Sequence, residues 1–178
     1  MASRSAMRVL LLAWLFSGLA QLSYSNGYND PQEERVVRAE SIADVMGGAT
    51  ILGSRIRSVR DLERAISRGI PKRALRVTVE RVYVSAGDVR RVMARIVPEA
   101  TFKRRVRLSH AESERTERLA RVIAAAEHAW SDQQDAREWL TRAHPELGRR
   151  APLDLALTEL GARQVEELLD RLFYGIPS

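Results

Sequence analysis

The closing forty residues, 139–178, constrain the fold most strongly, because residues that start and stop helices recur there at short intervals. Pro152 stands where a helix can begin, since the first turn of a helix does not use the N–H that proline lacks. Gly161 stands where a helix is expected to end in a left-handed residue. An apolar stripe at helical spacing follows: Val165, Leu168, Leu169 and Leu172. The chain therefore ends in short helices, the last of them closed by Gly175 and Pro177.

Serines followed three residues later by an acidic or amide residue predict further helix starts. In such a pair the serine hydroxyl accepts from a first-turn N–H, and the second side chain can reach back to the serine N–H. Four pairs have this spacing: Ser58 with Asp61, Ser85 with Asp88, Ser109 with Glu112, and Ser131 with Gln134. The third pair opens the longest predicted helix, which extends to about Trp130. These signals predict an all-α fold.

Residues 72–84 leave two structures open. The β-branched content of residues 77–84 favours a strand. The same apolar residues, taken with Ala74 and Leu75, also fit one face of a helix.

Charge is distributed unevenly along the chain. Residues 36–105 carry sixteen Lys or Arg against seven Asp or Glu, whereas residues 106–178 carry ten against thirteen. A basic half is typical of proteins that bind nucleic acid. Twenty-seven of the 29 basic residues are Arg, so a compositional bias could also raise the basic count, although it would not favour one half. The absence of cysteine excludes disulfides, thiolate catalysis and cysteine-based zinc sites.

Residues 85–105 have the layout of a helix, a break and a short basic helix. The first helix has an apolar face formed by Val89, Val92, Met93 and Ile96. Val97-Pro98 breaks it, and Pro98 can open a second helix in which Phe102 would be the buried anchor. The residues placed to meet phosphates or bases are Thr101, Lys103, Arg104 and Arg105. The alternative is a solvated helix end, where the helix dipole favours basic residues.

Together these features resemble the Xre/MbcA/ParS antitoxins, which pair with NAD-consuming RES-domain toxins. Their C-terminal toxin-binding domain has the same succession of elements: Trp139-Leu140, Leu147-Gly148, Pro152-Leu153-Asp154, Gly161 and Tyr174-Gly175. Residues 101–105 resemble the recognition helix of the Xre-like domain. Two positions depart from the family pattern: Ala151 replaces the usual Ser or Thr cap, and Ile96 replaces a glycine common in the turn.

The resemblance implies three segments and two partners. Residues 1–35 would be an extension, 36–107 an Xre-like helix-turn-helix module, and 108–178 a small helical toxin-binding module. The chain would neutralise a RES-type toxin by covering its NAD pocket, and would repress its own operon by binding operator DNA as a homodimer. The tail would carry inhibition, with toxin-binding residues Tyr174, Gly175, Ile176, Pro177 and Ser178.

Residues 1–35 allow two interpretations. Arg4 and Arg8 precede a short apolar run and small residues at positions 18 and 20, as in a secretory signal. The run is too short to span a bilayer. We favour a start assigned too far upstream, because an antitoxin must meet DNA and toxin in the cytoplasm. A true signal would instead indicate an exported or membrane-anchored helical adaptor with no DNA role.

The sequence offers little support for an enzyme. The three histidines, His110, His128 and His144, have neither the HExxH spacing nor any other paired-ligand spacing. No serine lies in a GxSxG motif. We therefore expect no catalytic residue, metal site, cofactor or small-molecule substrate.

Overall fold

The computed structural model describes residues 37–174, which belong to one compact unit and include no β-strand. The helices are α2 (Ala39–Val45), α3 (Gly48–Leu52), α4 (Val59–Ser67), α5 (Lys72–Glu80), α6 (Ala86–Ile96), α7 (Glu99–Arg104), α8 (His110–Trp130), α9 (Gln133–Thr141), the 3-10 turn η2 (Pro145–Leu147), α10 (Pro152–Leu155) and α11 (Glu159–Tyr174). The all-α prediction is confirmed: residues 72–80 of the ambiguous segment form helix α5, and residues 81–84 belong to neither a helix nor a strand. No helix of this part of the chain has the length and apolarity needed to cross a membrane.

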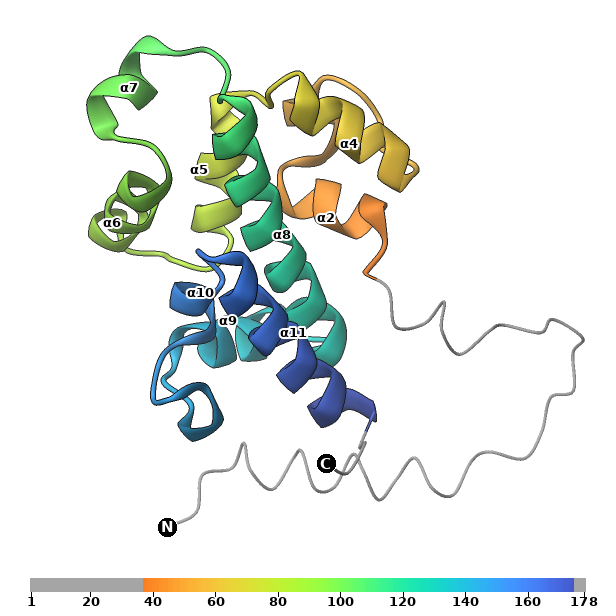
Figure 1. Cartoon of the computed structure of the whole chain (residues 1–178), viewed down its shortest axis with the longest axis vertical. Helices are drawn as coiled ribbons and strands as arrows, with labels where there is room; N and C mark the ends of the chain where they lie inside the picture. Colours follow the sequence, from red (N-terminus) through yellow and green to blue (C-terminus); the bar gives the residue numbers. More distant parts are fainter. Residues whose placement is uncertain (1–36, 175–178) are drawn as a thin grey trace, which may run out of the picture. The chain divides into compact units, whose positions relative to one another are not determined.

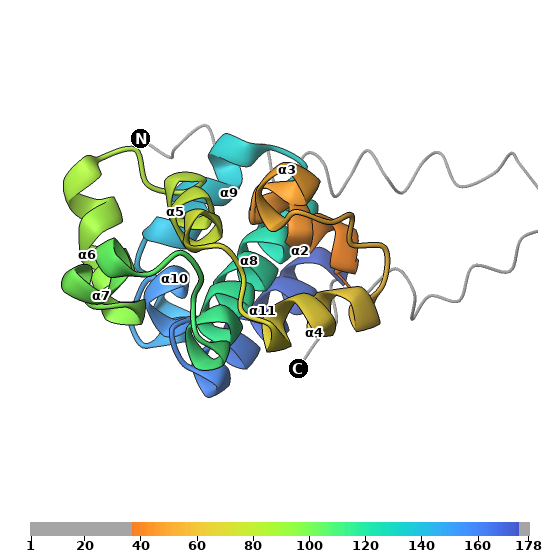
Figure 2. The same cartoon turned by 90° about the horizontal axis from the view of Figure 1, so that it is seen from above.

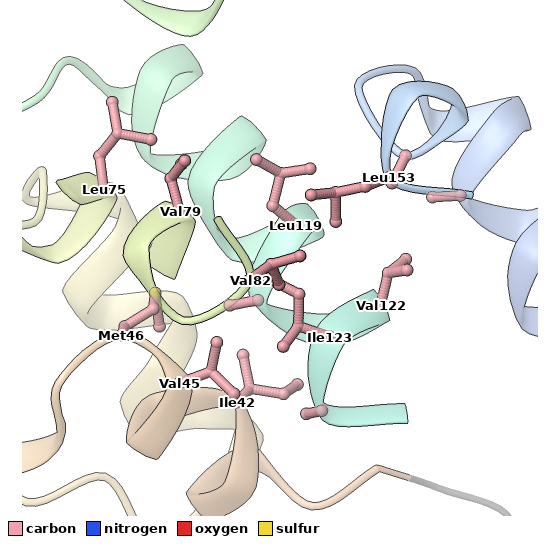
Figure 3. Close-up of a cluster of buried hydrophobic side chains, with 14 of the residues drawn as sticks. Ile42, Val45, Met46, Leu75, Val79, Val82, Leu119, Val122, Ile123 and Leu153 are labelled. Atoms are coloured by element: carbon pink, nitrogen blue, oxygen red, sulfur yellow. The ribbon is translucent and has the colours of Figure 1, made fainter. Parts of the chain in front are cut away.

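Helix α8 lies at the centre of this unit (Figures 1 and 2). Helices α2, α4, α5 and α6 contact it from the upstream half of the chain, and α9, α10 and α11 from the downstream half. Figure 3 shows side chains of α2, α5, α8 and α10, and of the segments just after α2 and α5, in this core: Ile42, Val45, Met46, Leu75, Val79, Val82, Leu119, Val122, Ile123 and Leu153. Each large side chain buried there stabilises the fold by about 1.5–3 kcal/mol. Both halves of the chain therefore share one core.

The start of α8 is fixed by the predicted capping box. Ser109 Oγ accepts from the Glu112 N–H at 3.3 Å, and the Glu112 carboxylate accepts from the Ser109 N–H at 2.7 Å. The end of α8 differs from the prediction, because Ser131 adopts a left-handed conformation (φ 52°) and closes the helix. Asp132 is the residue that caps α9, accepting N–H bonds from Gln134 and Asp135. The predicted cap at Ser131 is therefore wrong by one residue.

Of the two other predicted serine caps, one is present in the structure and one is absent. Ser58 Oγ accepts from the Asp61 N–H at 3.2 Å, as predicted. Ser85 precedes α6 but its side chain makes no capping bond, and Asp88 instead pairs with Arg91 at 2.7 Å. Ala151 precedes Pro152 at the start of α10 without a side-chain cap. Proline supplies the helix start there, while the cap that serine or threonine would provide is absent.

The predicted apolar stripes are buried, with one exception in the last helix. The buried stripe residues of α6 and α11 are Val89, Val92, Met93, Ile96, Val165, Leu168 and Leu169. Leu172 is 54% exposed. Helices α8 and α11 run side by side in the same direction, and α8 ends at Trp130 (Figure 1). The last turn of α11, where Leu172 lies, is therefore only partly covered.

Gly161 has a different role from the one predicted. It lies inside the first turn of α11 and has no left-handed backbone; Thr158 caps this helix by accepting the Gly161 N–H at 3.1 Å. A Cβ at position 161 would overlap the carbonyl oxygen of Leu155, at the end of α10. Glycine is required because α10 and α11 approach too closely for any side chain.

We expect Gly161→Ala to lower the unfolding free energy by about 2 kcal/mol, because the new methyl group must displace backbone. Gly87→Ala is a matched control, since Gly87 also lies in the first turn of a helix and its nearest new contact is Ser85 Oγ at 3.6 Å. That change should be neutral or stabilising by up to about 1 kcal/mol. Urea denaturation of both variants measures the difference, and equal effects would contradict the close approach.

Candidate functional site

Helices α6 and α7 form the predicted helix, break and second helix. Helix α6 packs against α5 and α8 through its buried face. Val97 then takes an extended conformation, and Pro98 precedes the first residue of α7. Helix α7 lies at the edge of the unit in Figure 1. A short helix without fully buried residues, α7, thus directly follows a well-packed helix, α6.

Phe102 is less buried than predicted. No residue of α7 is fully buried, and Phe102 is a partly buried residue at the margin of the core. Its ring borders an open cleft of about 790 Å³ between α5, α6 and α7. The other apolar residues of the cleft include Val89, Met93 and Val97, and its basic residues are Lys72, Arg73, Arg76, Arg90 and Lys103. Phe102 therefore contacts the core but leaves the cleft between α5, α6 and α7 unfilled.

The four residues predicted to meet DNA have different surroundings. Thr101 is partly buried, and Lys103 is exposed and pairs with Glu99 at 2.8 Å, which lowers the pKa of that carboxyl. Arg104 is exposed and makes no hydrogen bond or ion pair with the described residues. Arg105 lies just beyond the last residue of the helix. Arg104 is thus the α7 side chain most available to an external ligand.

Arg105 is already engaged within the chain. Its guanidinium pairs with Glu112 at 2.8 Å, the same carboxylate that completes the capping box of α8. Burial by itself would raise the pKa of Glu112, but the hydrogen bonds from Ser109 and the charge of Arg105 lower it. Arg105 therefore joins the end of α7 to the start of α8.

Backbone bonds tie the segment after α7 to the segment before α5. The Lys72 N–H donates to the Val106 carbonyl at 3.1 Å, and the Leu108 N–H donates to the Ile70 carbonyl at 2.9 Å. The Arg107 side chain donates to the Gly69 carbonyl at 2.7 Å. The sequence contains no signal for this pairing, because its partners lie more than thirty residues apart.

A polar seam joins α8 to α11; it consists of Glu117, Arg118 and Arg121 on α8 and Glu159 and Glu166 on α11. Arg118 pairs with Glu159 at 2.7 Å. Arg121 is shared by three carboxylates: Glu117 and Glu159 at 3.5 Å and Glu166 at 3.3 Å. Glu117 and Glu166 are partly buried, and one guanidinium that is also shared with the exposed Glu159 cannot offset the burial of both carboxylates. Burial accordingly raises the pKa of Glu117 and of Glu166, whereas the hydrogen bond from Arg118 lowers that of Glu159.

Further ion pairs connect the two halves of the chain. Arg81, just after α5, forms a two-bond pair with Glu127 of α8 at 2.7 and 2.8 Å, and this bonding raises the pKa of Arg81. Arg137 of α9 donates to the Arg81 carbonyl at 2.6 Å. Arg95 of α6 pairs with Asp154 of α10 at 2.6 Å. The helix that carries α7 is thus linked directly to the C-terminal helices.

Aromatic packing joins the end of α8 to the turn before η2. The Trp130 and Trp139 rings lie 4.9 Å apart, and the Trp139 and His144 rings 5.0 Å apart, measured between centroids. The His144 Nε2–H donates to the Trp139 carbonyl at 2.9 Å. Within residues 37–174, no three His, Asp or Glu side chains gather as a metal ion would require.

The predicted toxin-binding residues lie at the limit of what the structure describes. Tyr174 is the last residue of α11. Gly175, Ile176, Pro177 and Ser178 lie outside the described residues. Just before them, the ring of Phe173 lies 5.3 Å from that of His128 on α8, and Leu172 is 54% exposed. The role of the tail therefore stays a prediction.

The polar seam generates a pH prediction. Because the pKa of Glu117 is raised above its ordinary value of 4.5 on folding, the folded state holds this proton more tightly than the unfolded state. The contribution of Glu117 to the unfolding free energy therefore falls as pH rises out of the acidic range. Glu117→Gln should raise the unfolding free energy near pH 7, and the gain should vanish below about pH 4.

Arg121→Met should instead lower the unfolding free energy by about 2 kcal/mol near pH 7, since this change leaves carboxylates unpaired.

Denaturation across this pH range measures both effects. Glu114→Gln is the control, because Glu114 is about half exposed on the same helix and pairs only with His110. It should change stability by less than about 0.5 kcal/mol. A Glu117→Gln variant that is less stable than the natural chain near pH 7 would contradict the assignment.

Comparison with known proteins finds two domain matches along the chain. Residues 61–121 match the model of the antitoxin Xre-like helix-turn-helix domain, which spans α4 to the first half of α8. Residues 125–175 match the model of the antitoxin Xre/MbcA/ParS C-terminal toxin-binding domain, which starts in the last turns of α8.

A curated relative supports the same family. Antitoxin Xre of Pseudomonas putida is 31% identical over 84 residues, which is 45% of this chain and 53% of that protein. The match thus spans about half the length of the relative. With a helix-turn-helix domain preceding a toxin-binding domain on an all-α fold, this chain belongs to the Xre/MbcA/ParS family of antitoxins.

Proposed function

We propose that this chain neutralises a cognate RES-type, NAD-consuming toxin through residues 108–178 and represses its own operon through residues 36–107. The observation that carries the proposal is the presence of both family domains, in this order, around one helix, α8. The relative in Pseudomonas putida is named Antitoxin Xre. Both partners would be met in the cytoplasm.

The geometry of α6 and α7 supports the DNA-binding half of this function. Helix α6 is held in the core, so it can present α7 in a fixed direction, as a helix-turn-helix presents its second helix to the major groove. Arg104 is free to bind a guanine edge or a phosphate, and Lys103 can exchange its exposed pairing with Glu99 for a phosphate. Readers of this kind bind paired half-sites, so the chain would act as a homodimer.

The packing of α11 supports the toxin-binding half. Its buried stripe and the polar seam hold α11 along α8, so the chain beyond Tyr174 would start from a rigid support. We propose that residues 174–178 enter or cover the NAD pocket of the toxin and exclude the substrate. Leu172, exposed in the last turn of the same helix, offers apolar contact area close to Tyr174.

Arg104→Ala should weaken binding to the DNA upstream of the chain's own reading frame by about tenfold. If Arg104 neutralises one phosphate, the slope of log K against log salt should fall by about one. Arg142→Ala is the matched control. Like Arg104, Arg142 is an exposed arginine at a helix end, but it follows α9 and lies outside the helix-turn-helix domain. Arg105 is a poorer target, because its loss would also disturb the cap of α8. Fluorescence anisotropy over a salt series measures the change, and unaltered binding would remove α7 from the interface.

A chain that ends at Phe173 should fail to neutralise the toxin, because it lacks every residue predicted to enter the pocket. It keeps Phe173, and hence the ring contact with His128 that closes α11 on α8. Co-expression with the product of the adjacent reading frame, following growth and cellular NAD, measures neutralisation. The shortened chain should still bind the upstream DNA. If it rescues growth and NAD as well as the full chain does, inhibition lies elsewhere on α9 to α11.

A further inference from the structure

Helix α7 is short and weakly buried, so its attachment to the unit requires an explanation. It has six residues, none of them fully buried. A helix of this length is not stable alone in water, so neighbouring groups must hold it in place. Phe102 supplies one contact, at the margin of the core. A second contact comes from Lys72, the first residue of α5, which the sequence had not singled out.

The Lys72 ammonium group meets the C-terminal end of α7. Its Nζ donates to the Phe102 carbonyl at 3.0 Å and to the Lys103 carbonyl at 3.3 Å. The same atom lies 5.2 Å from the centroid of the Phe102 ring. The last carbonyls of a helix lack partners within it and carry the negative end of its dipole. Lys72 therefore satisfies two open carbonyl groups and places a positive charge where the dipole favours one.

The residue type fits this role. The sequence uses Arg at 27 of its 29 basic positions and has lysine only at Lys72 and Lys103. A lysine ammonium is a compact charge with three donors, so it can reach two carbonyl oxygens on adjacent residues and still face a ring. The backbone bond from the Lys72 N–H to the Val106 carbonyl also fixes this residue to the segment just after α7.

We propose that Lys72 is a positioning residue for DNA recognition: it holds α7 at a fixed angle to α5, so that α7 meets the DNA in one register. The inference rests on the proposed DNA-binding function and extends it to a residue outside helices α6 and α7. Lys72 acts through the α7 carbonyls and Phe102, and does not itself contact DNA. Because the α7 backbone contacts exist without DNA, the positioning can be tested separately from binding.

Lys72→Met is the test variant, because methionine keeps an unbranched apolar side chain over Phe102 but removes the donors and the charge. Arg73→Met is its matched control. Arg73 is the next residue of α5 and also borders the cleft. It is exposed, and its side chain makes no hydrogen bond or ion pair with the described residues. Hydrogen exchange of a peptide covering residues 99–106 should be about tenfold faster in Lys72→Met and unchanged in Arg73→Met. Equal exchange in the two variants would overturn the proposal.

The DNA readout separates positioning from direct contact. Lys72→Met should lower affinity for the upstream DNA about tenfold, leave binding to unrelated DNA unchanged, and preserve the salt slope. If the slope falls by about one and both DNAs bind more weakly, Lys72 contacts a phosphate and the positioning role is wrong. If the natural chain does not distinguish the two DNAs, the proposed function fails, whereas the exchange experiment still decides whether Lys72 holds α7. Thermal melting within a few degrees of the natural chain verifies that each variant is folded.

Discussion

The burial of α8 is the constraint on which the rest of the structure depends. Leu119, Val122 and Ile123 are almost completely inaccessible, and helices from both halves of the chain are needed to cover them. Helix α8 also begins within one family domain and ends within the other. Neither domain can bury its own apolar surface without this helix, so the two functions rest on one hydrophobic core.

Ion pairs add to this shared core. Arg81, just after α5, pairs with Glu127 of α8, Arg95 of α6 pairs with Asp154 of α10, and Arg121 joins α8 to α11. Charged contacts as well as apolar packing therefore link the helices of the two halves of the chain.

Local signals predicted the helices well where only neighbouring residues were involved. Ser109 with Glu112 and Ser58 with Asp61 cap their helices as expected, because both partners lie within one turn. Ser131 has the same spacing but closes α8, and Asp132 takes its place, because α9 must turn back against α8. Gly161 was correctly singled out, but for the wrong reason: the carbonyl that excludes a side chain belongs to a different helix.

The sequence by itself determined the all-α class, most helix positions, the apolar faces that become buried, and the resemblance to an antitoxin. These depend on periodicity, capping and order along the chain, which are local properties. Only the tertiary structure decided that α8 unites the two halves, that three carboxylates share Arg121, that Arg105 is engaged while Arg104 is free, and that Lys72 holds α7. The physical reason is that each of these depends on a distance between residues far apart in the sequence, which helix patterns leave undetermined until the helices pack.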